Sequence, residues 1–76
     1  MRVLRSINEA GALRCLDVFR RDDGSYGFEE YRRDPEEASG WYPVGGQAGR
    51  RFSSQEEAEA AAREAVAWLK DADGAL

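Results

Sequence analysis

The chain has 76 residues, enough for one domain with one hydrophobic core. Its 15 acidic and 11 basic residues give a formal net charge of −4, which disfavours a nonspecific nucleic-acid binder because such proteins bring a basic excess to the phosphates. The sequence has no histidine, so the usual base at neutral pH and the commonest metal ligand are both missing. We therefore expect no enzymatic activity, no cofactor and no metal site.

The first half of the chain predicts a β-hairpin. Residues 13–20 alternate as a strand does, but both faces are partly apolar, so the pattern does not say which face is buried. Residues 22–25 have the Asp-Gly chemistry of a hairpin turn, and residues 26–33 form the returning strand. Before the hairpin, residues 1–7 alternate only weakly and leave open whether they form a strand, while residues 8–11 have the composition of a turn.

The aromatic residues of the returning strand do not share one face. Tyr26 and Phe28 are in phase with each other, whereas Tyr31 falls out of that phase. A bulge around Glu29 and Glu30 would reconcile them, and we predict one there.

The stretch from residue 34 to residue 52 is irregular. Residues 34–40 open with Asp-Pro and close with Gly, which predicts a single helical turn, with a plain acidic loop as the alternative. Residues 41–44 predict a short strand that Pro43 confines to an edge or an end of the sheet. Residues 45–49 are rich in glycine and predict a flexible connector, and residues 50–52 predict a last short strand.

The last third of the chain predicts a long amphipathic helix over about residues 54–70, with a frayed tail over residues 71–76. Ser54 and Glu57 form a capping box at its start. Its apolar stripe presents mostly methyl groups, so the helix must lie very close to the sheet; the members of the stripe are Ala58, Ala61, Ala62, Ala65, Trp68 and Leu69. The predicted fold is α+β: three or four short antiparallel strands followed by one long C-terminal helix packed on one face.

The single cysteine, Cys15, excludes an internal disulfide and predicts a reducing compartment. Because it lies mid-strand with no candidate base nearby in sequence, we interpret it as a core thiol and not as a nucleophile. No apolar run approaches the ~18 residues of a membrane span. The first residues also have no apolar core of signal-peptide length. Together these features predict a cytoplasmic protein that does not bind membranes.

Trp41 and Tyr42 are the candidate partner-binding residues. Two large aromatic side chains between Gly40 and Pro43 either cap a small core or form an exposed anchor of the kind that dominates binding interfaces.

Arginine pairs beside aromatic residues suggest an alternative, which is nucleic-acid binding by the sheet. The pairs lie at predicted strand ends and comprise Arg20, Arg21, Arg32, Arg33, Arg50 and Arg51. The closeness of acidic residues in sequence favours the other interpretation, in which these arginines form cross-strand ion pairs with Asp22, Asp23, Glu29, Glu30 and Asp34.

Two stretches carry a resemblance to known families. Residues Ser54-x-Glu56-Glu57-Ala58, Ala62-Arg63-Glu64-Ala65-Val66 and Trp68-Leu69, with the strand opening Asp23-Gly24-Ser25-Tyr26, resemble the βββα unit of HicB-type antitoxins over roughly half of the chain. That resemblance implies a protein that binds and neutralises a small RNA-cleaving toxin. Residues 52–58, together with residues 26–33, are similar to the DNA-binding domain of plant ethylene-response factors and its phage-integrase relatives. This second resemblance implies DNA contacts from the sheet.

These observations lead to one functional hypothesis and one alternative. We expect a small non-catalytic interaction module that binds a protein partner or a second copy of itself through the face or an edge of the sheet. The alternative is nucleic-acid binding through the arginine pairs.

Overall fold

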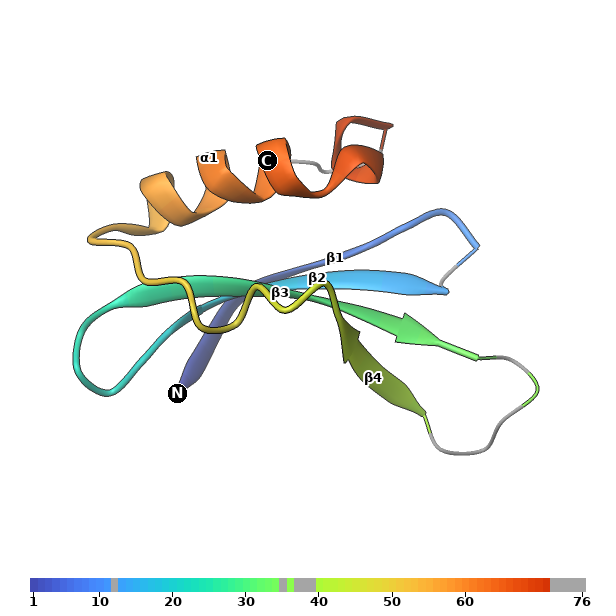
Figure 1. Ribbon diagram of the computed structural model, residues 1–76, viewed down its shortest axis with the longest axis horizontal. Coiled ribbons are helices and arrows are strands. Elements are labelled where there is room, and N and C mark those ends of the chain that lie inside the picture. Colours follow the sequence, from blue (N-terminus) through green and yellow to red (C-terminus); the bar gives the residue numbers. More distant parts are fainter. Residues whose placement is uncertain (12, 35, 37–39, 72–76) are drawn as a thin grey trace.

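Each strand of the sheet pairs with its neighbour along the chain. The computed structural model, which describes residues 1–11, 13–34, 36 and 40–71, contains a four-stranded antiparallel sheet in the order β1-β2-β3-β4 (Figure 1). The strands are β1 (Arg2–Asn8), β2 (Arg14–Arg20), β3 (Tyr26–Arg33) and β4 (Trp41–Val44). The helix α1 (Gln55–Ala65) and the 3-10 helix η1 (Ala67–Asp71) follow. The predicted α+β architecture is confirmed, and the first residues of the chain do form a strand.

A tight turn over residues 22–25 joins β2 to β3, as the sequence predicts. Asp23 Oδ1 accepts hydrogen bonds from Ser25 N at 2.9 Å and from Ser25 Oγ at 2.7 Å. Gly24 has a φ of 89°, a left-handed conformation that costs glycine little. The Ser25 hydrogen bonds, assisted by the Arg51 guanidinium, hold the pKa of the Asp23 carboxyl well below its usual range.

The predicted bulge at residues 29–30 is wrong. The β2–β3 register passes through both glutamates without a shift, so Phe28 and Tyr31, three residues apart, lie on opposite faces of the sheet. Phe28 is fully buried under the helix, and Tyr31 lies on the other side. The register shifts instead within β1, between residues 3 and 5.

The face of the sheet that carries α1 holds the hydrophobic core. Its buried side chains are Ile7, Leu16, Val18, Phe28, Ala58, Ala61, Ala62, Val66 and Leu69. The Phe28 ring stacks on the half-buried Phe52 ring, with 5.9 Å between the ring centroids. Because the buried side chains of α1 are all alanine, the helix backbone lies close to the larger side chains of β2 and β3.

The start of α1 is capped as the sequence predicts, with one shift. Ser54 Oγ accepts a hydrogen bond from Glu57 N at 3.1 Å. The Glu57 carboxylate, however, accepts hydrogen bonds from Ser53 N and Ser53 Oγ, at 3.0 and 2.6 Å, which is one residue earlier than a capping box requires. These two hydrogen bonds lower the pKa of Glu57.

The end of the helix differs from the prediction of a helix to about residue 70. The chain leaves α1 at Val66, whose backbone is extended, with φ −119° and ψ 97°, before η1 begins. Val66 and Leu69 are buried beyond this break, whereas Ala65 in the last turn of α1 is exposed. The prediction that Ala65 belongs to the apolar stripe is therefore wrong. That prediction was based on an unbroken helix to about residue 70.

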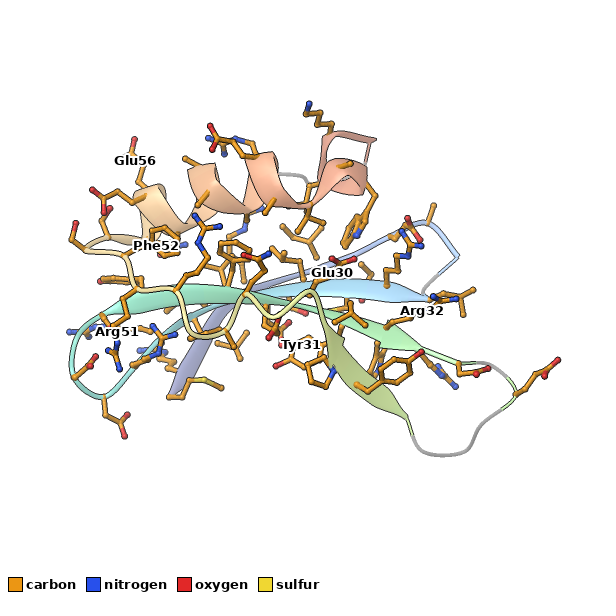
Figure 2. All side chains as sticks on the ribbon, viewed as in Figure 1. Glu30, Tyr31, Arg32, Arg51, Phe52 and Glu56 are labelled. Atoms are coloured by element: carbon orange, nitrogen blue, oxygen red, sulfur yellow. The ribbon has the colours of Figure 1, made fainter. Side chains whose placement is uncertain are left out.

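A polar contact fixes η1 to the sheet. Trp68 Nε1 donates a hydrogen bond of 2.9 Å to Glu30 Oε2, which comes from β3 on the helix side of the sheet (Figure 2). The Trp68 ring also packs against the core. This carboxylate lets a half-buried indole satisfy its N–H without leaving the core.

The connector between β4 and α1 is held in place by side chains of the sheet. Gln47 N and Ala48 N donate to the carboxylate of Glu29, at 3.3 and 3.2 Å. The Arg21 guanidinium donates to Ala48 O and, at 3.2 Å, to Arg50 O. The connector predicted to be flexible is thus tied to β3 on one side and to the end of β2 on the other.

Two further predictions concern the ends of this irregular region. The short strand predicted over residues 50–52 is reduced to a single bridge, in which Phe52 and Tyr26 exchange two backbone hydrogen bonds of 2.9 Å. The helical turn predicted over residues 34–40 and the frayed tail lie largely outside the described residues.

Candidate binding surface on the open face of the sheet

The two faces of the sheet have different surroundings. Figure 1 shows α1 on one side of the sheet, with β4 turning away from it. We call the opposite side the open face. It contains a shallow hollow of about 310 Å³, which is lined by Ser6, Asn8, Cys15, Asp17, Tyr31 and Trp41.

The strand register brings these lining residues together. Ser6 lies opposite Asp17, and Asn8 lies opposite Cys15, where β1 pairs with β2. Cys15 in turn lies opposite Tyr31, where β2 pairs with β3. The floor of the hollow thus spans three strands that are contiguous in sequence, and a fourth strand contributes Trp41 at its border.

Cys15 forms part of the floor. Its side chain is 9% exposed, its Sγ lies 3.3 Å from Ser6 Oγ, and it donates a hydrogen bond of 3.5 Å to Asp17 Oδ1. Burial raises the pKa of this thiol, and the charge of Asp17 adds to the increase. A thiol that resists ionisation is a poor nucleophile. Cys15 is buried as expected, but it lies on the open face and not in the hydrophobic core under α1.

Negative charge gathers on the open face. Asp17 and Glu29 lie directly opposite each other on β2 and β3, an arrangement in which like charges repel. Glu29 is only 4% exposed, and its carboxylate accepts hydrogen bonds from backbone N–H groups of the connector. Burial raises the pKa of Tyr31, and the charges of Asp17 and Glu29 raise it further.

The two candidate anchor residues lie on different faces. Trp41 and Tyr42 are 42% and 38% exposed, so neither ring caps the core. As neighbours on β4 they point in opposite directions. Trp41 lines the hollow, whereas Tyr42 lies opposite Arg32 on the face that carries α1. One flat interface on the open face can therefore use only Trp41.

The candidate nucleic-acid residues are not brought to one surface. Arg20 lies opposite Tyr26 at one end of the β2–β3 ladder, and Arg32 lies opposite Arg14 at the other. Figure 2 shows the same separation, with Arg51 near the hairpin turn and Arg32 at the far end of the sheet. The structure therefore gathers Arg20, Arg21, Arg50 and Arg51 at the hairpin end and leaves Arg32 and Arg33 apart from them.

Several of the arginines at the hairpin end make contacts within the protein. Arg51 forms an ion pair with Asp23, as the ion-pair interpretation expects. The guanidinium of Arg21 lies 4.9 Å from the Phe19 ring centroid, and that of Arg50 lies 5.2 Å from the Phe52 centroid. These cation–π contacts hold the groups against the protein's own surface.

Of the six lining residues, sequence reasoning identified only Trp41 as a binding residue and missed Ser6, Asn8, Cys15, Asp17 and Tyr31. Asp17 shares the alternation phase of Cys15 and could have been assigned to the same face from the pattern of β2 alone. Ser6 and Asn8 carried no such signal, because their positions depend on the register between β1 and β2.

Two further observations concern the described part of the chain. It contains no group of three or more Cys, Asp or Glu side chains placed to hold a metal ion. Nor does it contain a helix with the length and apolar character needed to cross a membrane. In comparisons with protein-family models, curated proteins and solved structures, no match to this chain was found.

Proposed function

We propose that this protein is a small non-catalytic interaction module of the cytoplasm, which binds a protein partner or a second copy of itself through the open face of its sheet. The observation that carries the proposal is the exposed Trp41 beside a hollow that, among the described residues, no helix covers. A large exposed aromatic next to a concavity is typical of the anchors that dominate protein interfaces. The lone thiol of Cys15 supports the reducing compartment.

The face is a better docking surface than either edge. β4 has four residues and includes Pro43, which has no backbone N–H to donate to an added strand. β1 has a register shift between residues 3 and 5, and an irregular strand is a poor template for pairing. Both edges therefore carry features by which proteins discourage strand addition.

One specific form of this proposal follows from the helix. If the likeness of residues 54–69 to HicB-type antitoxins reflects a shared role, the partner is a small RNA-cleaving toxin. The proposal does not depend on this identification, because the hollow and Trp41 are features of the sheet.

The test uses two neighbouring aromatic residues with similar exposure on opposite faces. Sedimentation velocity over a range of protein concentrations, with affinity capture from cells that encode the protein, would be carried out on the wild type and on the variants Trp41→Ser and Tyr42→Ser. We expect the wild type to dimerise or capture a partner, Trp41→Ser to lose this association and Tyr42→Ser to keep it.

Three results would count against the proposal. A strictly monomeric wild type that captures no partner would refute it. Equal losses in the two variants would remove the open face as the interface. Binding of mixed-sequence DNA or RNA that weakens steeply with salt would favour the arginine-based alternative.

A further inference from the structure

The charge on the described lining of the hollow is negative. Among the described residues that line it, Asp17 is the only charged one, and Ser6 and Asn8 add side-chain oxygens that can accept hydrogen bonds. Glu29, opposite Asp17, adds a second negative charge close to the floor. No lysine or arginine is among the lining residues of the described chain. The hollow therefore favours a positively charged occupant on electrostatic grounds.

Aromatic rings form the other part of the lining. Tyr31 rises from β3 and Trp41 from the edge strand β4. The faces of such rings attract cations, and a planar guanidinium can also stack on them. Carboxylate and aromatic rings in one shallow concavity are thus complementary to a cation that has both N–H donors and a flat face.

Two of the protein's own arginines on this face lie outside the lining of the hollow. Arg21 packs over Phe19 and binds the connector, as described above. Arg33 is exposed and lies opposite Trp41 in the register. Neither lines the hollow, so Asp17 faces it without a basic neighbour in the lining.

We propose that the hollow binds an arginine side chain from a basic segment of the protein partner. The guanidinium donates hydrogen bonds to the Asp17 carboxylate and stacks on the Trp41 ring, and Ser6 and Asn8 accept from its remaining N–H groups. Arginine fits better than lysine because its guanidinium carries five N–H donors in one plane and can stack its flat face on an aromatic ring. This inference rests on the proposed function, since it specifies the chemistry of the partner.

The first test uses the full chain and two small probes, N-acetyl-arginine methylamide and its neutral isostere N-acetyl-citrulline methylamide. In amide NMR spectra we expect the arginine probe to cause saturable shifts at Asp17, Tyr31 and Trp41, with a dissociation constant on the order of millimolar for a single side chain. We expect no saturable shift with the citrulline probe. Equal responses to both probes would overturn the inference.

Variants separate the site from general charge attraction. Asp17→Asn should weaken binding of the arginine probe by about tenfold or more, in line with the loss of a charge-assisted hydrogen bond. Asp22→Asn removes the same charge at the distant hairpin turn and should leave binding unchanged. If Asp17→Asn does not fold, Trp41→Ser decides, because its side chain is exposed and its loss should also abolish the shifts. Similar weakening in Asp22→Asn and Asp17→Asn would overturn the inference.

The outcomes distinguish this inference from the proposed function. A partner or dimer that is lost in Trp41→Ser, with no response to the arginine probe, would refute the arginine site and leave the interaction module intact. A monomer that captures nothing yet binds the arginine probe would refute the proposed function and leave the site.

Discussion

The alanine face of α1 makes overpacking the most direct test of the fold. Ala62 is fully buried between the helix and the sheet, whereas Ala60 on the same helix is exposed. Replacing Ala62 by leucine adds three carbon atoms where the surrounding side chains leave no room. Such insertions into a packed core typically cost about 1–3 kcal/mol. Ala60→Leu makes the same chemical change on the solvent side and should stay within about 0.5 kcal/mol of the wild type.

The loss of stability expected for Ala62→Leu, about 1–3 kcal/mol, is large relative to the total stability of so small a domain. At the usual 0.05–0.15 kcal/mol per residue, 76 residues give a free energy of unfolding of roughly 4–11 kcal/mol. A loss of 1 kcal/mol should lower the melting temperature by about 4–8 °C in a domain of this size. Urea denaturation followed by circular dichroism would measure both variants. Equal denaturation midpoints for Ala62→Leu and Ala60→Leu would refute the close packing of α1 on the sheet.

Three further perturbations test contacts elsewhere in the structure. Gly27→Ala should cost about 1–3 kcal/mol, because an added Cβ would lie 2.9 Å from a buried ring on β2. Gly49→Ala, with nothing within 4 Å of the added atom, should be nearly neutral in the same urea assay. Trp68→Phe should cost about 1–3 kcal/mol by leaving Glu30 without its indole donor, and a smaller loss in a Glu30→Gln background would identify that hydrogen bond. Asp23→Asn should flatten the fall in melting temperature below about pH 4. The lowered pKa of Asp23 means that its stabilisation is present above the unfolded pKa and is lost as the pH falls through the folded one. An unchanged pH slope would contradict this assignment.

Local sequence signals were sufficient for most of the fold. The Asp-Gly turn, the alternation on either side of it and the Ser54 cap each act over a few residues, and each is found where it was predicted. The errors arose where a distant contact decides the local structure. The bulge was introduced to bring Tyr31 into phase with Phe28, but the open face provides a place for Tyr31 without one.

The end of the helix shows the same dependence on tertiary contacts. An uninterrupted apolar stripe predicts one helix to residue 70, yet α1 ends at Ala65, and the buried Val66 and Leu69 lie beyond its end. The break also accompanies the Trp68 hydrogen bond to Glu30, a residue 38 positions earlier in the chain. No periodicity within the helix itself carries that information.

The candidate site was only partly predictable for a related reason. Trp41 was identified from its residue type and its turn-forming neighbours. The other lining residues are ordinary in sequence, and they acquire a shared role only when three strands align in one register. A polar residue such as Asn8 cannot be assigned to a surface before the strand opposite it is known.

The sequential pairing of the strands has a consequence for how the protein folds. Each hairpin closes only a short loop, so the entropic cost of closure is small and the sheet can grow one strand at a time. Mixed domains of low contact order fold quickly, and the helix, which needs a completed β2–β3 surface, is expected to dock late. In stopped-flow experiments Gly27→Ala should therefore mainly slow folding, whereas Ala62→Leu should mainly speed unfolding.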